Sequence, residues 1–407
     1  MIIHNQELLK SFYEHDKINV AIVSDIYFPT FGGATFVVDN LAKSLNATGM
    51  VNAVVVTGEV KGYQDKVDYP VIRCKSLAIP KSLGDSLPIP NYDKNFKKLI
   101  DELNIDVVDV HTVFGVCTYF MNYAKKNNLP IAFHGHSKFN QEYPTIVKFA
   151  PVCKYMINRA YKIVKKADMV LPVSNNTMQE YLKFGVKNQM RVLSNATDLV
   201  ECAEPDLAFS YVEKMHGITK DFENVLVFVS RIEAECKNIW FMLDSLKILS
   251  EKGLNFKTII IGDGKDLEKV KKTVQKIGLS DKIVFTGEIR DRQVLSYYLY
   301  RADLNIFPSV KDTFSLTKTE SASQKTPTLA IENTGAGEGI VDGENGFLSK
   351  EIKEDFADKI LFALSDKNML KIVSVNAQKT LGKNWDYIAN ESVEIYQKLI
   401  EEKVKTK

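Results

Sequence analysis

The chain has 407 residues, of which 45% are hydrophobic and 26% are charged, as in an ordinary soluble globular protein. This length exceeds one ordinary hydrophobic core and favours two domains. A net charge of +2 gives no global argument for nucleic acid as a partner. Five scattered cysteines without a C-x-x-C pair favour reduced thiols in the cytoplasm over a disulfide framework.

No apolar run approaches the roughly 20 residues that span a bilayer. Residues 1–17 carry charges throughout and lack the apolar core of a signal peptide. We therefore expect any contact with a membrane to be peripheral, on the inner face of the cell membrane.

Short apolar runs alternate with longer amphipathic runs along the first half of the chain. A helix is expected at 36–49, ending at Gly49. Strands are expected at 18–25, 51–58, 107–111, 131–136 and 169–174. This alternation predicts parallel strands joined by helices.

The same alternation starts again after a polar stretch around 198–223. Strands are expected at 224–230, 256–264, 282–288, 302–309 and 326–332, separated by helices at 238–252, 265–278, 291–301 and 316–325. Two such series predict two doubly wound α/β domains, one over 1–198 and one over 199–385. We expect the last helix, around 386–403 in the segment 386–407, to pack back on the first domain. Because ligands bind at the carboxyl ends of strands in such sheets, the cleft between the domains is the expected site.

Two cations lie close together in the second series. Arg231 directly follows the strand at 224–230, and Lys237 lies six residues later. The fork of donors on arginine and the point charge of lysine suit a diphosphate. The alternative is a surface ion pair of Arg231 with Glu233 or Glu235.

Two spaced carboxylates follow in the segment 308–327. Asp312 should lie before a helix and Glu320 inside it. A carboxylate can accept hydrogen bonds from two sugar hydroxyls, and the start of a helix can bind an anion. Together with the cations, this pattern predicts a site for a molecule with phosphates at one end and hydroxyls at the other, such as a nucleotide-sugar. The alternative is that Asp312 caps the helix.

Glycines follow one strand of each series. Gly33, preceded by Gly32, lies before the helix at 36–49, and the run IIGDG occupies 260–264. Glycine lets the backbone approach a ligand closely, although a plain turn explains each position as well. Neither run matches the G-x-G-x-x-G of dinucleotide-binding folds.

Three histidines lie in two predicted strands, and two of them end their strands. His134 and His136 lie two apart and share a face, and His111 ends the preceding strand. A zinc site would need further ligands, and we expect no metal here. His136, at the end of its strand, is the better candidate for a polar contact with a ligand, and a structural role is the alternative.

The segment 148–166 contains six basic residues and no acidic residue. A basic amphipathic helix can lie on anionic lipid, but a core-facing helix with solvated lysines has the same pattern. The apolar positions recur at helical spacing and are Val152, Tyr155, Met156, Ala160, Ile163, Val164 and Ala167.

Over almost its whole length the chain resembles the retaining glycosyltransferases of family 4, which have the GT-B fold of two Rossmann-like domains with the active site in the cleft between them. The motifs of the second half carry the resemblance most specifically: VSR (229–231), Lys237-Asn238, the run 260–289, DTFSLTKTE (312–320) and EGIVDGENGFL (338–348). Looser matches in the first half are SDIYFPTFGG (24–33), DVVDVHT (106–112), PIAFHGHS (130–137) and LPVSNNT (171–177).

This resemblance implies roles for the residues of the donor site. Arg231 and Lys237 would hold the donor diphosphate, Glu320 would bind the ribose hydroxyls, and Asp312 would meet the donor sugar. Backbone contacts near the sugar and phosphates would come from Phe314, Ser315 and Leu316.

The resemblance also implies three contacts outside that motif. Gly33 would let the first-domain loop approach the diphosphate, Ile289 would present its backbone to the base, and His136 would lie beside the reaction centre.

Among subfamilies the chain looks most like the bacterial 1,2-diacylglycerol glucosyltransferases, through SDIYFP, the PIP before Asn91, the run 136–143 and the basic helix that follows it. It departs from the family pattern at Asp109, where a histidine is usual. It also departs at SNATD (194–198), which replaces the common PNGVD.

The resemblance implies hexose transfer with retained configuration, from a donor that is expected to be a UDP-sugar. No D-x-D pair is placed at a strand end to hold a metal, so we expect neither a metal nor a cofactor to be required. The expected acceptor is diacylglycerol or another membrane lipid. The alternatives are a soluble, polysaccharide or protein acceptor, a nucleotide-sugar epimerase, and a non-catalytic GT-B partner subunit.

Overall fold

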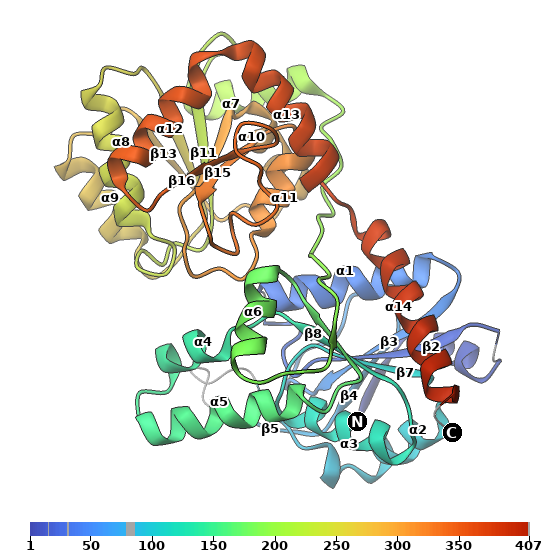
Figure 1. Cartoon of the computed structure of the whole chain (residues 1–407). Helices are drawn as coiled ribbons and strands as arrows, with labels where there is room; N and C mark the ends of the chain where they lie inside the picture. The colour runs from blue at the N-terminus through green and yellow to red at the C-terminus, as the bar shows by residue number, and fades with distance from the viewer. Residues whose placement is uncertain (15, 31, 79–85, 406–407) are drawn as a thin grey trace. The chain divides into compact units, whose positions relative to one another are not determined.

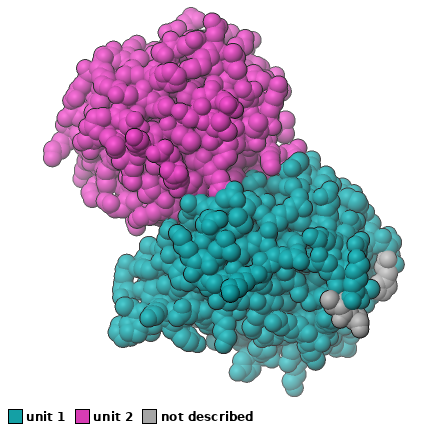
Figure 2. All heavy atoms as spheres, in the orientation of Figure 1, with its two compact units in different colours: residues 1–195, 385–407 teal, residues 196–384 magenta. Residues whose placement is uncertain are grey.

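The computed structural model describes residues 1–14, 16–30, 32–78 and 86–405, so Phe31 of the SDIYFPTFGG motif lies outside the described residues. The chain divides into two compact units (Figure 1, Figure 2). Unit 1 comprises Met1–Asn195 and Trp385–Lys407, and unit 2 comprises Ala196–Asn384. The expected domain boundaries, after 198 and after 385, lie slightly further along the chain.

Unit 1 is built on a mixed sheet with the strand order β1-β4-β3-β2-β7-β8-β9-β10. Its strands are β1 (Ile2–His4), β2 (Ile18–Val23), β3 (Val51–Gly58), β4 (Val71–Cys74), β7 (Val107–Val110), β8 (Ile131–Gly135), β9 (Met169–Pro172) and β10 (Gln189–Met190). Neighbouring strands pair in parallel, except that β1 and β4 are antiparallel. A separate antiparallel pair consists of β5 (Ser76–Ala78) and β6 (Ser86–Pro88).

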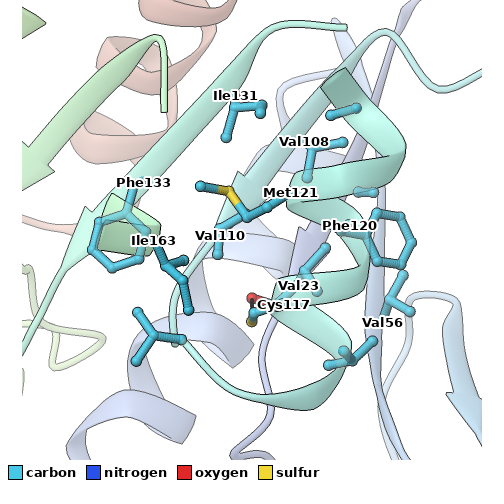
Figure 3. Packing of buried hydrophobic residues seen from close by; sticks show 14 of the residues in the cluster. Val23, Val56, Val108, Val110, Cys117, Phe120, Met121, Ile131, Phe133 and Ile163 are labelled. Carbon is cyan, nitrogen blue, oxygen red and sulfur yellow. Dashed lines mark hydrogen bonds between the residues drawn. The ribbon is translucent and has the colours of Figure 1, made fainter. Parts of the chain in front are cut away.

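The helices of unit 1 connect these strands. They are η1 (Gln6–Tyr13), α1 (Gly33–Ala47), η3 (Pro90–Tyr92), α2 (Lys94–Glu102), α3 (Gly115–Lys126), α4 (Phe139–Ile146), α5 (Ala150–Val164), α6 (Asn175–Lys183) and α14 (Trp385–Lys405). The apolar runs of the sequence form central strands that are buried on both faces, as parallel sheets covered by helices require. Figure 3 shows Phe120 and Met121 of α3 packing with Val108 and Val110 of β7, together with Ile163 of α5.

Unit 2 is built on a fully parallel sheet with the strand order β13-β12-β11-β14-β15-β16. Its strands are β11 (Val225–Val229), β12 (Lys257–Ile261), β13 (Ile283–Gly287), β14 (Leu304–Phe307), β15 (Thr328–Ile331) and β16 (Phe347–Ser349). Its helices are α7 (Pro205–His216), α8 (Ile239–Glu251), α9 (Leu267–Lys276), α10 (Arg292–Arg301), α11 (Leu316–Ser323), α12 (Lys353–Ser365) and α13 (Lys367–Leu381). A second hydrophobic core fills this unit.

The expected α/β class with two doubly wound sheets is confirmed. Several elements were not expected from the sequence, among them β1, β4, β16, α12 and α13. The polar stretch around 198–223 also holds a helix, α7, which has Pro205 in its first turn and is capped by Gly217 in the left-handed conformation. The expected C-terminal helix is α14. It runs beside α1 in unit 1 (Figure 1), where the rings of Trp385 and Phe36 meet edge to face.

Candidate functional site

Each sheet has a switch point within its parallel strands, where the strand order changes direction. In unit 2 the reversal lies between β11 and β14, and in unit 1 it lies between β2 and β7. At such switch points the loops leave neighbouring strands in opposite directions, and ligands bind at the carboxyl ends of the strands. Each unit therefore has one place at which its ligand site is expected.

In unit 2 the loop after β11 carries Arg231. A glycine turn after β12 holds this loop in place. A Cβ atom on Gly262 would lie 1.9 Å from the Ser230 carbonyl oxygen, and one on Gly264 would lie 2.5 Å from the Ile232 carbonyl oxygen. The IIGDG run is therefore required for close packing against the Arg231 loop, and the structure gives it no other role.

The Arg231 side chain is 76% exposed, and its Nη1 lies 3.5 Å from a Glu233 carboxylate oxygen. The ion pair weighed as an alternative therefore exists. An exposed pair of this kind contributes little to stability, about 0–1 kcal/mol, so it does not prevent the guanidinium from binding a ligand.

Lys237 and Asp312 form a tighter pair at the same edge. Lys237 Nζ donates to Asp312 Oδ1 at 2.6 Å, and both side chains are largely buried. Asp312 Oδ2 is buried and has no hydrogen-bond partner among the described residues. The alternative in which Asp312 caps the helix is wrong, because Ser315 is the N-cap of α11 and accepts a hydrogen bond from the Lys318 N–H at 3.1 Å.

The start of α11 places the predicted backbone contacts. Leu316 is the first residue of the helix, and Ser315 and Phe314 directly precede it. The first N–H groups of a helix have no acceptor within the helix and carry partial positive charge. The helix begins four residues after Asp312, and its first N–H groups are suited to an anionic ligand.

A buried lysine lies behind this loop. Lys318 Nζ donates to the Glu338 carbonyl oxygen and lies 5.0 Å from the centre of the Phe314 ring. Burial lowers the pKa of Lys318 to about 8. The sequence analysis did not single out Lys318, because a lysine inside a short helix gives no signal of its burial.

Glu320 lies in α11 and is held by an arginine that the sequence analysis missed. Arg292, at the start of α10, donates from Nη2 to Glu320 at 2.7 Å and also binds Asp198. Burial raises the pKa of Glu320, and Arg292 opposes this shift. Ile289, which precedes α10, is half-buried and packs on a satellite core of this unit.

In unit 1, an aspartate ties the ends of β2 and β7 together. Asp25 accepts hydrogen bonds from Thr112 Oγ1 at 2.7 Å, from the Phe114 N–H at 2.9 Å and from the Val116 N–H at 2.7 Å. Burial nevertheless raises its pKa. Gly33 begins α1 and is exposed at the helix N-terminus, where its N–H has no acceptor within the helix.

The three histidines come together at the carboxyl ends of β7 and β8. His111 Nδ1 lies 3.0 Å from His136 Nε2, and His111 Nε2 lies 3.1 Å from His134 Nδ1. Burial lowers the pKa of His136 well below its usual range and also lowers that of His111. His136 is therefore neutral at pH 7.

Asp109 lies beside these rings and is fully buried. Tyr396 of α14 donates from its hydroxyl to Asp109 Oδ2 at 2.6 Å. Burial disfavours the carboxylate, but the adjacent His134 and His111 rings outweigh that effect and lower the pKa of Asp109. Asp109, His111 and His134 each place one possible metal-ligating atom within 4.8 Å of the others. The sequence analysis lacked these ligands for His134 because they come from the neighbouring strand.

The basic helix α5 divides into two parts. Ala160, Ile163 and Val164 are buried in the core of unit 1, as in an ordinary helix. Its first turns, with the preceding loop, instead expose a set of apolar side chains, which we call the α4–α5 patch: Ile146 (68% exposed), Phe149 (68%), Val152 (45%) and Tyr155 (68%). The exposed lysines Lys148 and Lys154 lie within the same segment.

The structure thus groups the predicted donor residues within unit 2 and places His136 and Gly33 within unit 1. In unit 2, Lys237 is joined to Asp312, whereas Arg231 and Glu320 have their own partners. No helix of the described chain is long and apolar enough to cross a membrane.

Comparison with known families gives matches to both halves of the chain. A model described as Glycosyltransferase Family 4 matches residues 31–201, and one described as Glycosyl transferases group 1 matches residues 214–380. The chain is 24% identical over 374 residues to an alpha-monoglucosyldiacylglycerol synthase of Acholeplasma laidlawii, covering 89% of this chain and 92% of the relative. It is also 24% identical over 351 residues to an alpha-monoglucosyldiacylglycerol synthase of Streptococcus pneumoniae, covering 85% and 78%.

Solved structures share the fold over nearly the whole chain. Sucrose-phosphate synthase from Thermosynechococcus elongatus matches with a TM-score of 0.74 and 18% identity, covering 95% of this chain and 100% of that one. Anabaena HepE in complex with UDP and glucose matches with a TM-score of 0.68 and 16% identity, covering 93% and 99%.

Proposed function

Because the chain belongs to the family 4 glycosyltransferases and has the GT-B fold, we propose that it transfers a hexose from a UDP-sugar to a hydroxyl of a membrane lipid such as diacylglycerol, with retention of configuration. One observation carries the donor part of this proposal. The strand ends at the switch point of unit 2 bring two cations, Asp312 and the start of α11, the helix that carries Glu320, to one edge of a sheet.

The chemistry follows from these groups. The leaving diphosphate gains negative charge in the transition state, and Arg231, Lys237 and the N–H groups at the start of α11 would stabilise it there. Lys237 Nζ donates to Asp312 Oδ1 at 2.6 Å. When the diphosphate binds, it would share Lys237 with Asp312, and the Asp312 carboxylate would accept hydrogen bonds from the sugar.

Retention requires no carboxylate nucleophile in this scheme. The acceptor hydroxyl attacks on the face that the diphosphate leaves, and its proton passes to the departing phosphate oxygen. A neutral His136 beside the reaction centre would make a polar contact with the sugar or the acceptor. Because Arg231 and Lys237 would bind the diphosphate, added Mg²⁺ or Mn²⁺ should not raise the transfer rate of the purified protein.

The α4–α5 patch supports a lipid acceptor. Exposed aromatic and aliphatic side chains next to lysines suit the boundary between lipid headgroups and acyl chains. Two relatives that cover most of this chain are diacylglycerol glycolipid synthases by name. The patch would hold unit 1 at the membrane surface, where a diacylglycerol hydroxyl lies.

The proposal is tested by incubating the purified chain with labelled UDP-glucose or GDP-mannose and vesicles that contain diacylglycerol. We expect label from the UDP-sugar in an α-linked glycolipid, identified by the coupling constant of its anomeric proton. Label in a soluble acceptor would contradict the lipid assignment. Conversion of the donor in the absence of acceptor would indicate an epimerase, and no reaction of any donor would indicate a non-catalytic subunit.

Phe149→Ser with Tyr155→Ser provides a separate test of the patch. We expect weaker binding to vesicles at all salt concentrations, because apolar insertion is not screened by ions. Ile372→Ser, which alters an exposed apolar residue of unit 2, is the matched control. Equal effects of the two changes would contradict the role of the α4–α5 patch.

A further inference from the structure

The cluster at the carboxyl ends of β7 and β8 has the dimensions of a metal site. His134 Nδ1 lies 3.1 Å from His111 Nε2 and 3.2 Å from Asp109 Oδ1, and His111 Nε2 lies 3.6 Å from Asp109 Oδ2. In a tetrahedral zinc site with ligand atoms about 2.1 Å from the ion, neighbouring ligand atoms lie about 3.4 Å apart. The distances from His134 Nδ1 to His111 Nε2 and to Asp109 Oδ1 are close to this value, and the third distance is to the other carboxylate oxygen.

The cluster places a buried carboxylate beside two imidazole rings. Asp109 and His111 are fully buried, and the His134 side chain is only 5% exposed. Among the described residues, the ion-pair partners of Asp109 are these two rings, and neither is a fixed cation. A buried carboxylate without a compensating charge is strongly unfavourable, and a divalent ion between the three side chains would remove this penalty.

One carboxylate oxygen lacks a donor although a ring nitrogen is near. Asp109 Oδ1 is buried and accepts no hydrogen bond among the described residues. His134 Nδ1 lies 3.2 Å from it but is directed to His111 Nε2. Two ring nitrogens and one carboxylate oxygen therefore lie close together. The hydrogen bond between the two rings leaves the carboxylate oxygen without a donor.

The outer contacts match those of a metal centre. Ligating histidines usually donate their second nitrogen to another group, and ligating carboxylates are themselves hydrogen-bonded. His111 has its Nδ1 at 3.0 Å from His136 Nε2, which leaves Nε2 for an ion. The Tyr396 hydroxyl donates to Asp109 Oδ2 at 2.6 Å.

We propose that Asp109, His111 and His134 bind one Zn²⁺ ion. Two imidazoles and a carboxylate are ligands that zinc prefers, and three protein ligands leave one tetrahedral position for water. The ion would join β7 to β8 and, through Tyr396, would stabilise the docking of α14 on unit 1. This zinc site is separate from the donor residues of unit 2, so its existence does not depend on the proposed transfer reaction.

The experiment measures zinc directly. The full chain is purified, stripped with a chelator, dialysed against micromolar free Zn²⁺ and analysed for metal by mass spectrometry, and Co²⁺ is used in parallel as a spectroscopic probe. We expect one Zn²⁺ per chain, visible d–d absorption from the Co²⁺ form, and a higher unfolding temperature with Zn²⁺ than without it.

Variants locate the site. Asp109→Asn and His134→Gln should each weaken zinc binding roughly a hundredfold or more, because each removes a direct ligand. Tyr396→Phe removes an outer contact and should weaken it by roughly 10- to 100-fold. His216→Gln changes a histidine of unit 2 and is the matched control, with full zinc content expected.

Two results would overturn the proposal. One is a stripped wild-type chain that takes up no Zn²⁺, which needs no variant to interpret. The other is zinc bound equally well by wild type and by every variant of the cluster that folds, because the ion would then lie elsewhere. A protonated histidine would in either case be the charge that balances Asp109.

Discussion

Neutralising Glu320 and neutralising Asp312 should impair different steps, donor binding in the first case and sugar transfer in the second. Glu320 is expected to bind ribose, and its main partner in the chain is Arg292 at 2.7 Å. A hydrogen bond to a charged group contributes about 1.5–3 kcal/mol, and one to a neutral group about 0.5–1.5 kcal/mol. Replacing a carboxylate that accepts from two ribose hydroxyls by an amide should therefore weaken UDP binding by roughly 2–3 kcal/mol, or roughly 30- to 150-fold in Kd.

Asp312→Asn should have a different effect because of its pairing. Lys237 Nζ donates to Asp312 at 2.6 Å, and loss of the carboxylate charge leaves the ammonium free for the diphosphate. UDP affinity should then stay the same or rise. Transfer should fall by roughly a hundredfold, because the contact to the sugar is lost where charge develops.

Calorimetry with UDP and a transfer assay on both variants separate these outcomes. Glu344→Gln, at an exposed acid of the same unit, is the matched control, and unfolding curves establish that each variant is folded. An equal loss of UDP affinity in Glu320→Gln and Asp312→Asn would refute the division of roles. An unchanged affinity in Glu320→Gln would refute the ribose contact itself.

Three further predictions concern charges outside this pair. Arg231→Ala should lower turnover by roughly a hundredfold or more while leaving the unfolding midpoint nearly unchanged, because its ion pair is exposed; near-normal turnover would contradict the diphosphate role. Lys154→Glu, Lys162→Glu and Lys165→Glu together should abolish binding to anionic vesicles at low salt, at about 1 kcal/mol for each lysine; unchanged sedimentation with vesicles would contradict this. Lys318 has a pKa of about 8 in the folded chain, lowered from 10.5, so the unfolded state binds more protons between these values and stability rises with pH in that window. Lys318→Met should remove this rise and stabilise the chain by about 2–3 kcal/mol at pH 7, and an unchanged pH profile of the unfolding free energy would contradict the cause.

The sequence predicted strands and helices well where the apolar period was clear. Apolar runs in central strands such as β3 and β12 are buried on both faces, so continuous hydrophobicity with flanking turns suffices to identify them. Residues that directly follow such strands lie at the carboxyl edge of the sheet. This is why Arg231, two residues after β11, and Asp312, five residues after β14, are predicted to lie at one site.

The partners of these residues could not be predicted in the same way. Arg292 lies at the start of α10, and its bond to Glu320 depends on how α10 and α11 pack, which no local period encodes. The same limit applies to the Asp109 cluster, whose members come from two adjacent strands separated by a helix. In α5, periodicity identified an apolar stripe but could not distinguish its buried end from the exposed end in the α4–α5 patch.

Arg292 provides a last prediction, because its charge opposes the rise in the pKa of Glu320. Burial raises the pKa of Glu320 and Arg292 opposes the shift, so Arg292→Met should raise that pKa further. A protonated Glu320 is a weaker acceptor for ribose hydroxyls, so UDP affinity should fall in the variant and recover as pH rises through the new pKa. Asp198→Asn is the matched control, because it removes another partner of Arg292, leaves the bond to Glu320 in place and should lower the pKa of Glu320 instead of raising it. Titrations with UDP between pH 5.5 and about 8.5 measure the effect, since this range spans the values to which burial can raise a glutamate. If the UDP affinity of Arg292→Met does not change with pH, whatever the value of that affinity, then Glu320 needs no cation to stay charged. The pairing of Glu320 with Arg292 would in that case be structural.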